Sequence, residues 1–123
     1  MIRRTVKPPL SILVCEDEPL IRYEVAEVLK HLGYTVKVSA TVAEARRVLE
    51  LQTYDILLVD VELPNASGVD LAQIARALDP NIGVIFATGH VAAPAATAIR
   101  DSVLLNKPYG EAQLVRAIGR VTR

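Results

Sequence analysis

Short apolar runs alternate with helix-like patterns five times along this chain, and this alternation constrains the fold more than any other feature. The runs cover 10–15, 34–39, 56–59, 82–87 and 103–105. After the first run, Ile21, Val25 and Val28 recur at the spacing of one helix face. Alternating buried strands and helices form a parallel sheet with helices on both faces. We therefore expect an α/β, flavodoxin-like (βα)5 three-layer sandwich with strand order 2-1-3-4-5.

Local signals place most of the helix ends. Pro19 suits the first turn of the first helix, and Gly33 is expected to end it. The pair Thr41 and Glu44 forms a capping-box pattern at the start of the second helix. The segment 64–68 is predicted to be a loop. The fourth helix, expected within 90–102, contains Pro94, so we predict that it is divergent, short or mobile.

Composition excludes several classes of protein. The chain has 123 residues, of which 51% are hydrophobic, with 14 Lys and Arg against 14 Asp and Glu. Zero net charge argues against a nucleic-acid binder, and no apolar stretch is long enough for a membrane span. The single cysteine, Cys15, rules out a disulfide framework and is expected in the core. We expect a cytoplasmic protein with a basic arm over 1–9 and one domain over 10–123.

Residues that can carry chemistry follow the strands. Glu16, Asp17 and Glu18 follow the first strand, and Asp60 follows the third. The fourth and fifth strands are followed by Thr88-Gly89-His90 and by Asn106-Lys107-Pro108. Adjacent strands lie about 4.8 Å apart, so Asp17 and Asp60 should be close enough to repel unless a cation lies between them. Their oxygens suit Mg²⁺, and beside Mg²⁺ and a lysine an aspartate can act as a nucleophile toward a phosphoryl group.

Four segments together resemble the response-regulator receiver domain over nearly the whole chain. Val14-Cys15-Glu16-Asp17-Glu18 resembles the family's acidic pair, and 57–64 with Gly68 resembles the segment around its phosphoacceptor. Thr88-Gly89 and Lys107-Pro108-Tyr109 resemble its hydroxyl position and its Lys-Pro-aromatic motif. The resemblance implies a two-component phosphoacceptor that is phosphorylated and dephosphorylated by self-catalysis and is not an enzyme acting on other molecules.

The resemblance also assigns roles to individual residues. Asp60 would accept the phosphoryl group, Lys107 would pair with a phosphoryl oxygen, and the Thr88 hydroxyl and the Gly89 amide would donate to it. Mg²⁺ or Mn²⁺ would be held by Asp17, Asp60, the backbone carbonyl of Glu62 and, through water, Glu16.

Three features depart from the common pattern or refine it. Many members carry an aromatic switch residue three positions before the lysine, but here that residue is Leu104. Phe86-Ala87-Thr88-Gly89 resembles the signature of the FATGUY subfamily, whose members are mostly stand-alone receivers. Glu62 and His90 each lie two residues beyond a site residue, so we hypothesise that they pair above the site and tune hydrolysis. The alternative is two unrelated solvated side chains.

The resemblance implies a sensor histidine kinase or a histidine phosphotransfer protein as phosphodonor. A downstream partner would bind the region from Thr88 to the last helix, where Arg116, Arg120 and Arg123 form either a basic docking face or a merely solvated one. Neither nucleic acid nor membrane is expected as a partner, and both a monomer and a phosphorylation-dependent dimer stay open. Three alternatives also remain: a phosphorylation-independent interaction module, a receiver fragment of a larger hybrid kinase or regulator, and a small flavodoxin-like cofactor binder or enzyme.

Overall fold

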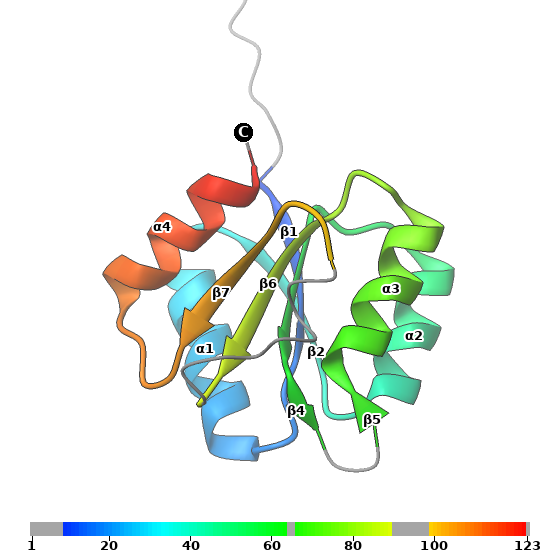
Figure 1. Cartoon of the computed structure of the whole chain (residues 1–123). Helices are drawn as coiled ribbons and strands as arrows, with labels where there is room; N and C mark the ends of the chain where they lie inside the picture. Colours follow the sequence, from blue (N-terminus) through cyan, green and yellow to red (C-terminus); the bar gives the residue numbers. More distant parts are fainter. Residues whose placement is uncertain (1–8, 64–65, 90–98, 123) are drawn as a thin grey trace, which may run out of the picture.

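A five-stranded parallel sheet forms the centre of the molecule (Figure 1). The computed structural model describes residues 9–63, 66–89 and 99–122. The strand order is β2-β1-β3-β6-β7, which confirms the predicted order 2-1-3-4-5. The strands are β1 (Ser11–Cys15), β2 (Thr35–Ser39), β3 (Ile56–Asp60), β6 (Gly83–Thr88) and β7 (Ser102–Asn106).

Helices cover both faces of this sheet (Figure 1). The described residues form α1 (Pro19–His31), α2 (Val42–Leu51), α3 (Gly68–Leu78) and α4 (Glu111–Val121). Helices α2 and α3 bury their apolar residues on one face, and α1 and α4 bury theirs on the other. The resulting three-layer α/β sandwich confirms the flavodoxin-like fold expected from the sequence. Within the described ranges, no helix is long and apolar enough to cross a membrane.

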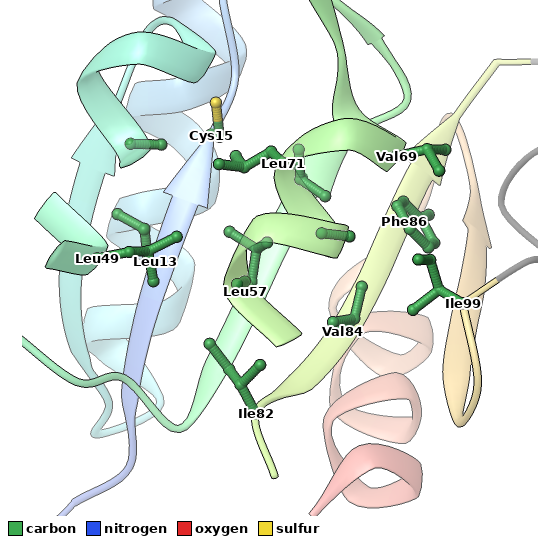
Figure 2. Packing of buried hydrophobic residues seen from close by; sticks show 14 of the residues in the cluster. Leu13, Cys15, Leu49, Leu57, Val69, Leu71, Ile82, Val84, Phe86 and Ile99 are labelled. Atoms are coloured by element: carbon green, nitrogen blue, oxygen red, sulfur yellow. The ribbon is translucent and has the colours of Figure 1, made fainter. Parts of the chain in front are cut away.

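Alternate residues of the three central strands, β1, β3 and β6, pack into two separate cores. Leu13, Leu57 and Phe86 pack beneath α2 and α3 (Figure 2), whereas Ile12 and Ile85 pack toward α1 and α4. All five residues of β3 are buried, as expected of a central strand covered on both faces. Full burial of each large apolar side chain contributes roughly 1.5–3 kcal/mol, so β3 is a firm support for the residues at its end.

Several predicted helix signals are confirmed. Pro19 is the first residue of α1, and Gly33, with φ +98°, follows the helix in a conformation that favours glycine. The Thr41 hydroxyl accepts a hydrogen bond from the Glu44 amide at 3.1 Å and so caps α2. Cys15 is buried, as expected of a small core residue.

The predicted loop over 64–68 is only partly a loop. Residues 62–67 contribute a short antiparallel pair, β4 (Glu62–Leu63) and β5 (Ala66–Ser67), and Gly68 already begins α3. The Ser67 hydroxyl caps α3 by accepting from the Val69 amide at 3.1 Å. This turn fixes the path of the chain immediately after Asp60.

The expected fourth helix lies largely outside the described residues, which leave out 90–98. Where the description resumes, Ile99 is buried and Asp101 has φ 54°. The Arg76 guanidinium of α3 donates to the carbonyls of Arg100 at 2.6 Å and Ile82 at 2.8 Å. Arg76 therefore ties the start of β6 to the approach to β7.

Candidate functional site

The strand register brings the predicted site residues to one edge of the sheet. In the parallel pairing Cys15 lies beside Val59, and Asp60 lies beside Ala87. Asp17 therefore lies just beyond β1, while Asp60 and Thr88 end β3 and β6. All three belong to the carboxyl edge, where ligands bind in open α/β sheets.

Three carboxylates gather at this edge. Ligand oxygens of Glu16, Asp17 and Asp60 all lie within 4.8 Å of one another. Glu16 and Asp60 are each only 5% exposed, while Asp17 is half-buried. Hard carboxylate oxygens clustered next to an opening to solvent are a donor set that fits Mg²⁺. The closeness of Asp17 and Asp60 predicted from strand spacing is confirmed.

Lys107 neutralises part of this negative charge. Its ammonium group donates to Asp60 Oδ2 at 2.5 Å and to Glu16 Oε1 at 3.2 Å. Its backbone amide donates to the Thr88 carbonyl at 2.8 Å, and its peptide bond to Pro108 is cis. Burial lowers the pKa of Lys107, but the hydrogen bond and charge of Asp60, with the charge of Glu16, outweigh burial and raise it. Lys107 therefore stays protonated.

Glu16 is held more tightly than the sequence suggested. Its Oε2 accepts from the Glu18 amide at 3.1 Å, and the Arg22 guanidinium of α1 donates to its backbone carbonyl at 2.9 Å. Burial raises the pKa of Glu16, and the Glu18 amide and the charge of Lys107 oppose this rise. The role of Arg22 was not predicted, although its position one turn into α1 places it near the end of β1.

Asp60 has a partner on each carboxylate oxygen. Oδ2 accepts from Lys107, and Oδ1 accepts from the Glu62 backbone amide at 3.0 Å. The Val61 amide donates to the Ala87 carbonyl at 2.9 Å and so extends the pairing of β3 with β6 past Asp60. Both oxygens of the carboxylate are thus held by hydrogen bonds.

Gly68 packs against the backbone of Asp60. A Cβ at this position would overlap the Asp60 carbonyl oxygen and would lie 3.0 Å from Val59 Cγ2. Only a residue without a side chain allows α3 to begin this close to the end of β3.

Thr88 is fully buried, and its hydroxyl points to Glu62. Its Oγ1 lies 3.0 Å from Glu62 Oε1 and 3.1 Å from Oε2, so the hydroxyl donates to this carboxylate. The sequence hypothesis paired Glu62 with His90, which lies outside the described residues. The contact with Thr88 was missed. The sequence did contain a signal for this contact, because β3 and β6 are neighbouring strands and Glu62 and Thr88 lie at their ends.

Comparison with known proteins agrees with this geometry. Residues 12–119 match the family model of the response regulator receiver domain. The chain belongs to the response regulator receiver family. As such it is similar to proteins of two-component signalling.

The chain is similar in sequence to curated relatives, over most of one and part of another. It is 32% identical over 113 residues to the response regulator receiver protein CpdR of Brucella abortus (strain 2308), covering 89% of this chain and 94% of the relative. It is 33% identical over 81 residues to the TorCAD operon transcriptional regulatory protein TorR of Escherichia coli (strain K12), covering 66% of this chain but only 35% of TorR. The likeness to TorR therefore extends to about a third of that protein.

Solved structures share the receiver fold. A response regulator receiver protein from Sinorhizobium medicae WSM419 has a TM-score of 0.86 and 27% identity, with 93% of this chain and 94% of that chain covered. The receiver domain of the sensor histidine kinase PA1611 from Pseudomonas aeruginosa PAO1 has a TM-score of 0.83 and 28% identity, covering 93% of this chain and 98% of that chain. The latter structure contains a magnesium ion coordinated in the active-site cleft.

The remaining predicted residues of this receiver domain lie at the margin of the site. Gly89 is exposed directly after β6, and Leu104 lies on β7 beside Phe86 with 40% of its surface exposed. The metal-ligand role of the Glu62 carbonyl and the donor role of the Gly89 amide stay predictions. Residues Asp17, Asp60, Thr88 and Lys107 are the predicted set that the fold brings together.

Proposed function

We propose that this receiver domain is a phosphoacceptor in two-component signalling, with Asp60 as the nucleophile. A carboxylate oxygen of Asp60 attacks the phosphorus of a phosphohistidine on a sensor histidine kinase or a histidine phosphotransfer protein. The new O–P bond forms as the N–P bond breaks, and the electron pair of the broken bond stays on the imidazole nitrogen. The observation that supports this proposal is the buried Asp60 carboxylate, 2.5 Å from the Lys107 ammonium group and clustered with Glu16 and Asp17.

The acidic cluster is suited to hold the divalent cation that such a transfer needs. Asp17 and Asp60 would bind Mg²⁺ or Mn²⁺ directly, together with the Glu62 carbonyl, and Glu16 would act through water. Bound Mg²⁺ supplies positive charge to the phosphoryl oxygens.

Lys107 and Thr88 serve the phosphorylated state. The ammonium group of Lys107 is already beside the acceptor and is held in its charged form, so it pairs with a phosphoryl oxygen. The Thr88 hydroxyl and the Gly89 amide, at the end of the neighbouring strand, donate to further oxygens. Phosphorylation and dephosphorylation are self-catalysed, and the domain is not an enzyme for other substrates.

An apolar groove beside the site suits the phosphodonor protein. The groove has a volume of about 470 Å³ and lies between α1 and the start of α4. Ile21, Val25 and Tyr109 contribute apolar lining, and Lys107 lies at its edge. Val28 and Leu114 complete the apolar lining.

Signal output is proposed to pass through a partner that binds the face of β7 and α4. Leu104 is 40% exposed there, and Arg116 and Arg120 are exposed beside it. The Phe86–Gly89 motif resembles the FATGUY signature, which supports a stand-alone cytoplasmic receiver. A monomer and a phosphorylation-dependent dimer both fit this proposal.

Intact mass spectrometry after incubation with acetyl phosphate and Mg²⁺ tests the central claim. The wild-type chain should gain the mass of one phosphoryl group, and Asp60→Asn should gain none. Asp101→Asn is the matched control, because Asp101 is exposed at the opposite edge and its positive φ suits Asn. It should gain the group normally. An absent adduct in the wild type would favour the phosphorylation-independent interaction module instead. An adduct of the same mass in Asp60→Asn would show that Asp60 is not the acceptor.

A further inference from the structure

Glu62 contacts both the nucleophile and the buried hydroxyl of the site. Its backbone amide donates to Asp60 Oδ1 at 3.0 Å, while its carboxylate accepts from Thr88 Oγ1 at 3.0 and 3.1 Å. The residue starts β4, whose pairing with β5 holds Glu62 opposite Ser67. One residue thus joins the end of β3 to the end of β6.

The hydroxyl of Thr88 has one proton and can donate it to one acceptor at a time. Both Glu62 oxygens lie within hydrogen-bond distance, so the proton is shared with a single carboxylate. A hydrogen bond to an ionised acceptor is stronger than one to a neutral group. While it lasts, the same proton is not given to a phosphoryl oxygen on Asp60.

We propose that the Glu62 carboxylate holds the Thr88 hydroxyl in the unphosphorylated state and must release it when Asp60 is phosphorylated. This inference rests on the proposed phosphoacceptor function. The hydroxyl then exchanges the carboxylate of Glu62 for a phosphoryl oxygen as acceptor. No covalent bond changes in this exchange, since only a hydrogen bond moves.

Charge favours the exchange in one direction. A phosphoryl group on Asp60 carries nearly two negative charges. It would lie close to the Glu62 carboxylate, because the Glu62 amide donates a hydrogen bond to Asp60 and the carboxylate accepts one from Thr88 on the neighbouring strand. Like charges at this range repel, so the Glu62 side chain moves away as the hydroxyl turns. The hold on Thr88 therefore lowers the affinity of the unphosphorylated site for any phosphoryl mimic by the strength of one hydrogen bond.

Glu62 is thus a positioning residue that acts through Thr88. Its backbone amide, which holds Asp60, is unaffected by a change of side chain other than to proline. Substitution of the side chain alone separates the hold on Thr88 from the support of the nucleophile.

A double-mutant cycle tests the proposal with beryllofluoride as the phosphoryl mimic. Its affinity in the presence of Mg²⁺ is measured by titration calorimetry for the wild type, Glu62→Ala, Thr88→Val and the double variant. We expect Glu62→Ala to bind beryllofluoride about five-fold more tightly than the wild type, the size of one hydrogen bond. In the Thr88→Val background the same substitution should change affinity by less than about two-fold, because the hydroxyl is gone.

The cycle distinguishes the hydrogen bond from simple charge repulsion. If Glu62 acted by charge alone, Glu62→Ala would tighten binding equally in both backgrounds, and the proposal would be wrong. An unchanged affinity in Glu62→Ala would also overturn it. Glu50→Ala, which removes an equal charge from the far end of α2, should leave affinity unchanged. Thermal unfolding of each variant confirms that it folds.

Two further controls separate this inference from the function on which it rests. Wild-type protein should bind beryllofluoride, and Asp60→Asn should not. If the wild type fails to bind, the phosphoacceptor proposal falls as well. If it binds normally and the cycle shows no coupling between Glu62 and Thr88, only the further inference falls.

Discussion

Among single residues, Lys107 has the largest effect on the charge of the site, because it offsets two carboxylates. It is the cation paired with both Asp60 and Glu16, at 2.5 and 3.2 Å, and its side chain is 23% exposed. Removing one partner of a largely buried ion pair leaves the remaining charges poorly solvated. The site therefore depends on this lysine for stability as well as for chemistry.

Lys107→Met should reduce the free energy of unfolding in the presence of a chelator by about 1–3 kcal/mol. Added Mg²⁺ should recover part of this loss, because a divalent cation compensates the same carboxylates. Urea unfolding with and without Mg²⁺ measures both effects. Lys30→Met is the control, since Lys30 forms an exposed pair with Glu27 at 3.5 Å and should cost at most about 0.5 kcal/mol. Equal losses in the two variants would contradict the prediction.

Tyr109, two residues after Lys107, provides a pH dependence in the alkaline range. Burial, with a smaller contribution from the charge of Glu16, raises the pKa of Tyr109 to about 12 from its ordinary value of 10.0. Deprotonation therefore favours the unfolded chain. The stabilisation is complete below pH 10 and is lost as the pH rises toward 12.

Tyr109→Phe should weaken this alkaline loss of stability. Between pH 10 and 12 the free energy of unfolding should fall less steeply than in the wild type, by roughly 1–2 kcal/mol in total. Urea unfolding across this pH range measures the difference, and tyrosinate absorbance should lose one late-titrating group. Tyr23→Phe is the control because Tyr23 is 64% exposed. A parallel fall in Tyr109→Phe and wild type would rule out this role.

The junction between β3 and α3 governs the site at the scale of elements. Helix α3 begins at Gly68, and the Gly68 amide donates to the Val61 carbonyl at 3.2 Å. Because a side chain at Gly68 would overlap the backbone of Asp60, the start of the helix and the position of Asp60 are linked.

Gly68→Ala should therefore destabilise the fold by about 1–3 kcal/mol, as overpacking against backbone does, and should slow phosphorylation of Asp60. Gly119→Ala is a matched control within α4, where a Cβ would contact nothing within 4 Å. That change should stabilise the protein by about 0.5–1 kcal/mol. Thermal unfolding and the rate of adduct formation measure both variants. A Gly68→Ala variant as stable and as reactive as Gly119→Ala would refute the linkage.

Elements with long, regular signals could be predicted from the sequence, and short ones could not. The run Ile56–Val59 identified the central strand, and the Thr41 cap was correct at atomic level. The β4–β5 pair was missed because two-residue strands have no periodicity to detect. The direction of the Glu62 side chain depends on that pair, so its contact with Thr88 was missed as well. The carboxyl-edge rule was enough for Asp17, Asp60 and Lys107, because parallel strands all end at the same edge.

At the scale of the whole molecule, metal binding is expected to be coupled to folding. The acidic cluster forms only when the loop after β1 and the end of β3 meet, so the unfolded chain lacks the site. A cation that binds only the folded state stabilises it by mass action, by about 2–3 kcal/mol at a hundred times its Kd.

Mg²⁺ should therefore raise the melting temperature of the wild-type domain, and a chelator should reverse the rise. Asp17→Asn should abolish most of this response, because it removes one predicted direct ligand. Asp101→Asn, remote from the cluster, should retain it. Calorimetric melting over a series of Mg²⁺ concentrations measures the effect. A full response in Asp17→Asn would show that Asp17 is not a ligand.

Glu62 makes one hydrogen bond through its backbone amide and another through its side chain, and only the side chain changes on substitution. Every amino acid except proline offers the amide that steadies Asp60, whereas the carboxylate that reaches Thr88 belongs to glutamate at this position. Mutation here can therefore vary one task while leaving the other intact. If the proposed role of Glu62 holds, substitutions at position 62 would change how readily the site adopts its phosphorylated state while leaving the support of Asp60 intact.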